Sequence, residues 1–235
     1  MANNKQIDHG HDHTHDHEHG HSIMSELICH FPYAIFSVAV SLSILSFLLY
    51  LTLGVVDPEL IRENADTLFH NFHFLHIVFA ATGVLISFFR FSKNIVKGIL
   101  VGIVTTITFC SLSDAVIPYI AGRLLGVDMH FHLCFLTELH NILPFLIIGL
   151  ANGVVMGLYH RSRGGFYSVF SHFFHILISS FASTFYIVSH GLLDWYQMIG
   201  MVFLFLIVAV VVPCTLSDVV IPMAAARAGK KNERN

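Results

Sequence analysis

The chain has 235 residues, of which 55% are hydrophobic and only 11% are charged. This composition excludes a soluble domain of the same length and predicts an integral membrane protein with the lipid bilayer as its main partner. The formal net charge is -3, and no basic patch interleaved with aromatic residues is present, which argues against a nucleic-acid partner.

Residues 1–25 form a histidine-rich segment. Seven histidines alternate with acidic and small residues between Asp8 and His21. This pattern predicts a disordered tail that binds borderline divalent metals loosely, as a buffer or sensor beside a transport site. An incidental polar tail or an expression tag is the alternative. Because no basic stretch followed by an apolar run opens the chain, we expect the first span to be an uncleaved anchor.

Six apolar stretches follow, each long enough to cross about 30 Å of hydrocarbon, which takes about 20 helical residues. They lie near residues 30–54, 69–91, 95–119, 138–159, 169–190 and 197–224. Most breaks between them are short and carry turn signals, so we expect consecutive helices to be antiparallel neighbours. Longer extramembrane segments are predicted over residues 55–68 and 123–137.

The positions of Lys and Arg predict the orientation, because basic loops are retained in the cytoplasm. All but two of the basic residues fall on one side of the predicted spans; Arg62 and Arg123 are the exceptions. We therefore predict that both termini, including a basic C-terminal tail at residues 230–235, are cytoplasmic, in a bacterial inner or plasma membrane.

The third and sixth spans end in the same element. Residues 110–118 read CSLSDAVIP and residues 214–222 read CTLSDVVIP, so seven of nine positions are identical. Two weaker echoes occur in the same order. The first pairs His70 and His73 with His172 and His175, and the second pairs Glu26 and Pro32 with Glu138 and Pro144. These matches predict two repeats, residues 26–126 and 138–229.

Each predicted repeat holds three spans, which is an odd number, so the second copy must be inverted in the membrane relative to the first. We therefore predict an all-α membrane protein of six transmembrane helices, built as two inverted three-helix repeats. Inverted repeats are typical of secondary transporters that work by alternating access. A duplicated set of helices that only packs symmetrically is the alternative.

The repeated element places an aspartate within each of two membrane spans, at Asp114 and Asp218. An ionised aspartate there costs about 2.5–3.5 kcal/mol, which predicts a function that offsets the cost. A proline follows each aspartate by four residues, and proline frees the carbonyl at i-4, here that of the aspartate itself. Loosened carbonyls facing a cavity are typical of cation sites in transporters. Cys110 and Cys214 precede the aspartates by four residues and share their helical faces.

Histidines recur every three residues on two of the spans. His70, His73 and His76 lie on the second span, and His172 and His175 lie on the fifth. Imidazoles spaced in this way can hold one metal ion or a close pair.

The predicted topology sorts these side chains into two sets. The outer set is His70, His73, His76, Asp114, Glu138 and His140, with His130 and His132 in the adjoining loop. The inner set is Glu26, His30, His172, His175 and Asp218, with His160 in reserve. With thiols nearby, each set suits Zn²⁺, Ni²⁺, Co²⁺, Mn²⁺ or Fe²⁺ better than Mg²⁺ or Ca²⁺. For His30, His160 and His190 taken singly, we favour a packed or interfacial role.

The repeated Ser-Asp-x-x-x-Pro resembles an element of a family of manganese or heavy-metal exporters, which are polytopic permeases with internal repeats. The overlap covers residues 111–118 and 215–222, and this chain is shorter than expected of that family. The resemblance implies heavy-metal efflux with Asp114 and Asp218 on the pathway, and it leaves the metal open.

These observations favour a divalent-metal transporter rather than an enzyme. Zinc is the expected substrate, with manganese, nickel and cobalt next. Protons are the expected coupling ion because metal binding displaces protons from its ligands, and a homo-oligomer is left open. The alternatives are a di-haem b-type cytochrome, a membrane metalloenzyme of the di-iron hydroxylase kind, and a metal sensor or accessory subunit.

Overall fold

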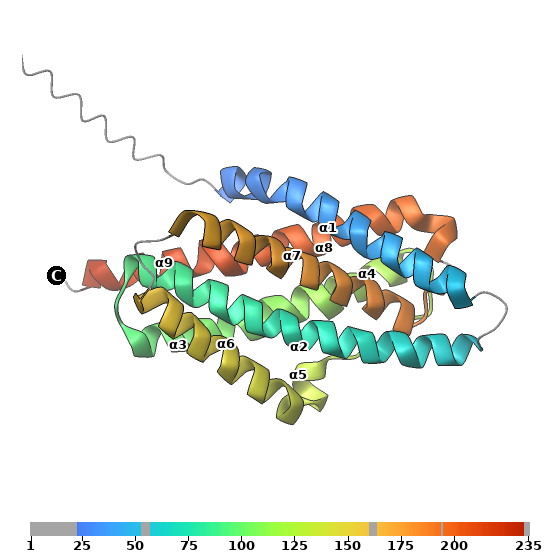
Figure 1. Cartoon of the computed structure of the whole chain (residues 1–235), viewed down its shortest axis with the longest axis horizontal. Helices are drawn as coiled ribbons and strands as arrows, with labels where there is room; N and C mark the ends of the chain where they lie inside the picture. The colour runs from blue at the N-terminus through green and yellow to red at the C-terminus, as the bar shows by residue number, and fades with distance from the viewer. Residues whose placement is uncertain (1–22, 53–56, 160–163, 194, 233–235) are drawn as a thin grey trace, which may run out of the picture.

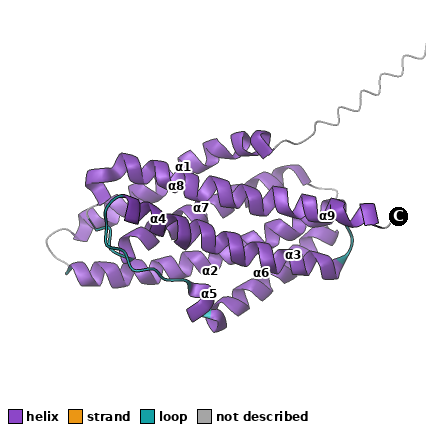
Figure 2. Cartoon of the chain, turned by 180° about the vertical axis from the view of Figure 1, so that it is seen from behind, coloured by secondary structure: helices purple, strands orange, loops and turns teal. Residues whose placement is uncertain are grey.

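The computed structural model describes residues 23–52, 57–159, 164–193 and 195–232. In this part of the chain every regular element is a helix (Figure 2). Six helices are long and apolar enough to cross a membrane. The prediction of an all-α protein with six helices able to span a membrane is therefore confirmed for this part of the chain. The histidine-rich tail up to residue 22 and His160 lie outside the described residues, as does the side chain of Glu26.

The elements follow one another along the chain with few interruptions. They are α1 (Ile23–Thr52), α2 (Pro58–Phe91), α3 (Ile95–Ser111), the π-helical turn η1 (Leu112–Val116), α4 (Ile117–Leu124), α5 (Cys134–Thr137), α6 (Leu139–Tyr159), α7 (Gly164–Ser189), the 3-10 turn η2 (Trp195–Met198), α8 (Ile199–Thr215), the π-helical turn η3 (Leu216–Val220) and α9 (Ile221–Asn232).

Helix α2 begins well before the predicted span, so residues 58–68, which were expected to form an extramembrane loop, are helical. Asp57 caps the helix, because its side chain accepts the backbone N–H of Glu59 at 2.9 Å, and proline is favoured in a first helical turn. The resulting helix of 34 residues is about 51 Å long. Its first turns therefore extend the wall of the molecule past the apolar region.

Both copies of the repeated element form a π-helical turn. In each turn the backbone N–H that follows it bonds the carbonyl five residues earlier: Ile117 to Leu112, and Ile221 to Leu216. In this register the N–H that proline lacks would have bonded the carbonyl five residues earlier, and not the carbonyl four residues earlier that was predicted. In the first copy, the carbonyl five residues before Pro118 is that of Ser113, and the Ser183 hydroxyl donates to it at 3.0 Å. The prolines thus widen the helices rather than break them.

Helices α2 and α7 form the centre of the bundle and pack against each other (Figure 1). Helix α2 also packs against α3 and α6, whereas α7 packs against α1 and α8. The first span of each predicted repeat therefore lies mainly against the other repeat. The expectation that consecutive helices are neighbours is wrong for α1 with α2 and for α6 with α7 in the described part of the chain.

Glycines let α6 approach α2 closely. A Cβ atom added at Gly149 would lie 2.8 Å from the carbonyl oxygen of Val78, and one added at Gly153 would lie 2.8 Å from the Cβ of Leu85. Small residues at such crossings are typical of membrane helices, because they allow backbone-to-backbone contact. This contact explains why α6 lies on α2 rather than on its own neighbour in sequence.

The two ends of the bundle carry opposite charge. The start of α1, the α2–α3 turn and the end of α9 lie at one end, on the left in Figure 1. We call this the basic end, because it carries Arg90, Lys93, Lys97 and Arg227. The opposite, acidic end carries Glu59, Glu63, Asp66 and Asp128, and there Arg62 and Arg123 pair with Glu59 and Asp128 at 3.4 and 2.5 Å.

Candidate metal centre

Two histidines on α2 share one carboxylate oxygen from η1. The Nδ1 atoms of His73 and His76 lie 2.9 and 2.6 Å from Oδ2 of Asp114. All three side chains are buried. Because a carboxylate oxygen can only accept, both Nδ1 atoms carry the hydrogen and both Nε2 atoms keep the lone pair.

Two histidines on α7 make the same arrangement with η3. The Nδ1 atoms of His172 and His175 lie 3.0 and 2.6 Å from Oδ2 of Asp218. The geometry therefore matches His73 with His172 and His76 with His175. The sequence match of His70 with His172 and of His73 with His175 is wrong by one helical turn, because three equally spaced histidines on α2 leave the register ambiguous.

The two arrangements meet at the middle of the bundle. The Nε2 atoms of His76 and His175 are 2.6 Å apart, and the Sγ atoms of Cys110 and Cys214 lie 3.8 and 3.9 Å from Nε2 of His76. We call these four residues the central site. The predicted outer and inner sets are therefore not separate, since His76 from one contacts His175 from the other.

The central site has the ligand types of a tetrahedral metal site with thiolates and imidazoles. Zinc bond lengths imply separations of about 3.6 Å between nitrogen and sulfur and about 3.3 Å between the two nitrogens. Both sulfurs lie close to the first of these separations from Nε2 of His76, but Cys110 is not in the group that His76 and His175 form with Cys214. The imidazoles would have to move apart by about 0.7 Å. The candidate ligand atoms of His76, His175 and Cys214 all lie within 4.8 Å of one another.

The facing imidazoles need a cation between them. Each ring gives its Nδ1–H to an aspartate, so two nitrogen lone pairs would oppose each other at 2.6 Å in a region with no exposure to solvent. Only a proton or a metal ion placed between the lone pairs makes this contact favourable. The aspartates then act as the carboxylate partners that orient metal-binding histidines and increase their basicity.

Hydroxyl groups hold the second oxygen of each aspartate. Asp114 Oδ1 accepts from Ser113 at 2.7 Å and from Ser179 at 2.9 Å, whereas Asp218 Oδ1 accepts from Ser217 at 3.1 Å. In place of a second serine, Gly83 lies so close to Asp218 that an added Cβ would be 3.2 Å from both carboxylate oxygens.

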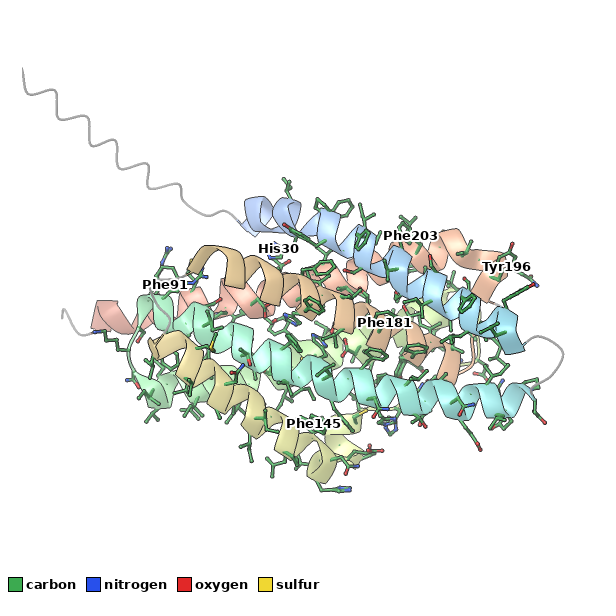
Figure 3. All side chains as sticks on the ribbon, viewed as in Figure 1. His30, Phe91, Phe145, Phe181, Tyr196 and Phe203 are labelled. Carbon is green, nitrogen blue, oxygen red and sulfur yellow. The ribbon has the colours of Figure 1, made fainter. Side chains whose placement is uncertain are left out.

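The inner flank of the central site ends at His172. Its Nε2 atom is buried and has no hydrogen-bond partner among the described residues. The His30 ring on α1 contacts it edge-on, with ring centroids 4.0 Å apart, and Figure 3 shows this histidine lying between α1 and α7. His172, His175 and Asp218 together form a further possible metal group. His30 therefore packs against a member of this group. The expected packed or interfacial role did not specify that contact.

The predicted residues near the acidic end do not all join the centre. His70 Nε2 lies 3.4 Å from Glu138 Oε1, and neither residue is in the metal group of His76, His175 and Cys214. His140 is exposed and belongs to none of the metal groups found in the described residues. Its position on the outer surface of α6 removes it from the candidate ligands.

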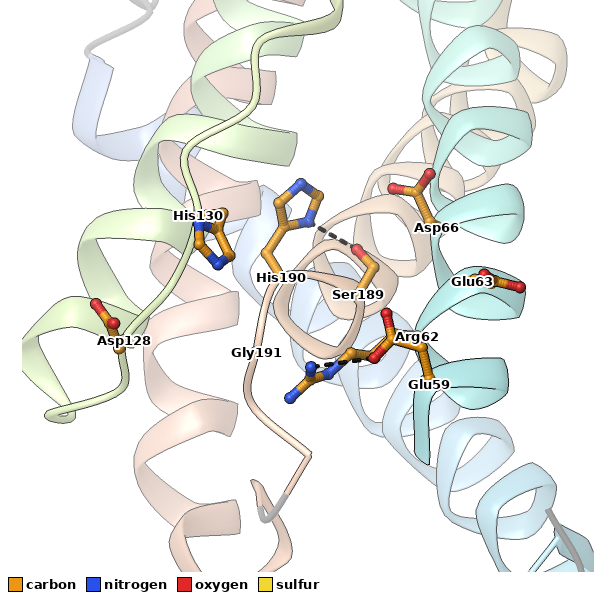
Figure 4. A pocket seen from close by; sticks show the side chains of 9 residues that line it. All are labelled: Glu59, Arg62, Glu63, Asp66, Asp128, His130, Ser189, His190 and Gly191. Atoms are coloured by element: carbon orange, nitrogen blue, oxygen red, sulfur yellow. Dashed lines mark hydrogen bonds and ion pairs between the residues drawn. The ribbon is translucent and has the colours of Figure 1, made fainter. Parts of the chain in front are cut away.

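A cavity of about 360 Å³ opens at the acidic end (Figure 4). It is lined by Glu59, Arg62, Glu63, Asp66, Asp128, His130, Ser189, His190 and Gly191. Four carboxylates against one arginine give it a negative potential that attracts cations. Burial lowers the pKa of His190, so this ring adds no positive charge near neutral pH.

Some members of these sites are not evident from sequence. Ser179 follows His175 by four residues and so shares its helical face, which is a weak signal. Gly83 and Cys134 carried no signal beyond their residue types. Comparisons with models of protein families, with curated proteins and with solved structures find no match to this chain, so its function has to be argued from geometry.

Proposed function

We propose that this chain transports divalent transition-metal ions across a membrane by alternating access. The observation that carries the proposal is the central site: two imidazoles with opposed lone pairs, flanked by two thiols, at the contact between α2 and α7. Each half of the sequence supplies one histidine, one cysteine and one aspartate. A site shared in this way changes shape whenever the halves move relative to each other.

The ligand set favours zinc as the substrate. Thiolate and imidazole ligands suit Zn²⁺, whose structural and transport sites are commonly tetrahedral. Cobalt and nickel can use the same ligands. Manganese prefers oxygen ligands, so a site with two thiols makes it the weakest of the four expected substrates.

A neighbouring group gives the ion a way to leave. A site with four protein ligands is also typical of structural zinc, which does not exchange readily. Here His175 belongs both to the central site and to the group formed with His172 and Asp218. An ion can therefore pass from one group to the next by exchanging ligands one at a time, without entering the lipid.

Topology and charge support an inverted arrangement of the two repeats. The matching turns η1 and η3 lie in the third and the sixth span and are thus an odd number of spans apart, and the first helix of each repeat packs mainly on the other repeat. The basic end holds the start of α1 and the end of α9, which supports cytoplasmic termini. The resemblance to heavy-metal exporters, with Asp114 and Asp218 on the pathway, adds efflux as the expected direction.

Proton exchange is the proposed coupling. In the absence of metal, a proton between His76 and His175 is the cation that the geometry requires. A metal ion that takes this place displaces that proton and those of any thiols that bind it. Metal flux one way would then be linked to proton flux the other way.

The site geometry argues against the alternatives. Two axial histidines of one haem stand on opposite faces of a porphyrin, whereas these two rings are in direct contact. A metalloenzyme keeps an open coordination position that its substrate can reach, whereas the side chains of the central site are buried. A metal sensor would bind the same ion but would not move it.

The test is flux into proteoliposomes that contain a zinc-responsive dye. We expect saturable zinc uptake by the wild type and loss of uptake in the double variant Cys110→Ser/Cys214→Ser. The control is His140→Gln, which changes an exposed histidine outside the centre and should retain flux. Stoichiometric zinc binding without any flux would contradict the transporter and favour the sensor. Flux that does not respond to a pH gradient would contradict proton coupling.

A further inference from the structure

A second cluster of metal-binding side chains lies toward the acidic end, away from the central site. His70 belongs to α2, and His132 and Cys134 belong to the connection between α4 and α6. Candidate ligand atoms of these three residues all lie within 4.8 Å of one another. Glu138, at the end of α5, brings Oε1 to 3.4 Å from Nε2 of His70. Two nitrogens and a sulfur thus face one another, and a carboxylate oxygen lies beside one of the nitrogens.

Hydrogen bonding fixes His70 in the form that binds metal. Its Nδ1 lies 2.8 Å from the backbone carbonyl oxygen of Asp66. Since a carbonyl only accepts, Nδ1 carries a hydrogen, and the neutral ring then presents the lone pair of Nε2. That Nε2 atom is buried and has no hydrogen-bond partner among the described residues. A buried imidazole nitrogen without a hydrogen-bond partner is costly. Histidines that bind metals commonly donate the N–H of their other ring nitrogen to a backbone carbonyl, as His70 does here.

The connection is already held in place from the opposite side. The Tyr186 hydroxyl on α7 accepts the backbone N–H of His132 at 3.2 Å and lies 3.4 Å from the carbonyl oxygen of the same residue. The backbone N–H of Glu138 bonds the carbonyl of Cys134 at 2.7 Å. The two side chains from the connection therefore approach His70 from a backbone that α7 positions.

We propose that His70, His132, Cys134 and Glu138 form a second site for zinc or a similar ion, which fastens the connection between the two repeats onto α2. This site shares no residue with the central site, so it does not depend on whether the protein transports metal. An ion bound here joins α2 to a segment anchored on α7. It therefore restrains the acidic end, where these two helices border the cavity.

Cobalt titration tests the second site, because cobalt bound to thiolate gives a near-ultraviolet charge-transfer band. The protein is the full chain in detergent, with the seven histidines between residues 8 and 21 replaced by asparagine. We expect two ions per chain, and one ion after Cys134→Ser or His132→Gln. The double variant Cys110→Ser/Cys214→Ser should retain one ion and its thiolate charge-transfer band. Adding Cys134→Ser to this variant should remove that ion and the band.

The matched control is His130→Gln, an exposed histidine in the same connection but outside the cluster, which should retain both ions. Gel filtration and circular dichroism check that each variant is folded. A single ion in the parent protein that is unaffected by Cys134→Ser and His132→Gln would overturn the second site. Loss of zinc flux with both ions still bound would instead overturn the proposed transport.

Limited proteolysis tests the fastening. Saturating zinc should slow cleavage between residues 125 and 138 several-fold in the parent protein, and Cys134→Ser should abolish this protection. The Cys110→Ser/Cys214→Ser variant should retain it. Protection that persists in Cys134→Ser and disappears when the central cysteines are replaced would show that the central ion orders the connection, which contradicts the role assigned to the second site.

Discussion

The two halves of the central site differ in how their aspartates are supported. Asp114 receives two hydroxyl donors, whereas Asp218 receives one and lies against the Cα of Gly83. Orientation of the carboxylate fixes the tautomer of the histidine that it contacts. The half around Asp114 thus has the more hydrogen-bond donors, whereas the half around Asp218 is held in part by close packing against Gly83.

Ser179→Ala should weaken metal binding at the central site. The substitution removes one of two donors to Asp114 Oδ1, and loss of such supporting contacts typically lowers metal affinity about 10- to 100-fold. Titration calorimetry with zinc measures the change. Ser180→Ala is the matched control, because the Ser180 hydroxyl donates to the Ile176 carbonyl of its own helix. Equal affinities in the two variants would contradict a supporting role for Ser179.

Gly83→Ala should also reduce metal affinity, by pressing a methyl group on the Asp218 carboxylate. The reference is Gly200→Ala in α8, where an added Cβ meets nothing within 4 Å. There the change should raise stability by about 0.5–1 kcal/mol, since alanine favours the helix. Calorimetry and thermal unfolding together separate the two effects. A Gly83→Ala protein with unchanged zinc affinity would show that Asp218 moves aside freely.

At the scale of elements, the π-helical turns are what carry the aspartates into the centre. Each widened turn gives up regular hydrogen bonding just before a proline, and a membrane interior makes an unsatisfied carbonyl costly. In the first copy, Ser183 from α7 supplies the missing donor. The turn in η1 is therefore stabilised by a helix of the other half.

Ser183→Ala should lower stability by about 1 kcal/mol, because it leaves the buried Ser113 carbonyl without this donor. Thermal unfolding in detergent measures the loss. The control is Ser43→Ala, whose hydroxyl donates to the Ala39 carbonyl on the exposed side of α1 and should change little. If Ser183→Ala unfolds at the temperature of the control, the hydroxyl does not support the turn.

At the scale of the whole molecule, charge asymmetry predicts how the protein sits in its membrane. The side chain of Asp128 is 96% exposed at the acidic end, whereas Cys110, Cys134 and Cys214 are buried. In intact cells, Asp128→Cys should react with a membrane-impermeant maleimide. The protein without this substitution is the control and gives the background labelling. A cysteine added at the C-terminus should react only after lysis. Labelling of both positions in intact cells would contradict cytoplasmic termini.

Composition was enough to predict six helices long and apolar enough to span a membrane. Histidine spacing identified the right helices, but three equally spaced rings could not fix which two meet Asp114. Side-chain packing across the bundle decided that, as it did the exposed position of His140 and the roles of Ser179 and Gly83. The crossing of α6 to the other half depends on glycine contacts with α2 that are far apart in sequence, which no local pattern encodes.

That crossing bears on how such a chain arose. Each half by itself would leave the face of its second helix uncovered, while its first helix would have no partner in its own half. With the two repeats inverted as proposed, two identical half-length chains inserted in opposite directions would cover both faces by exchanging their first helices. Duplication and fusion of the gene would then join a swapped dimer into one chain. The contact between His76 and His175 would descend from a histidine meeting its own copy on the two-fold axis of that ancestor.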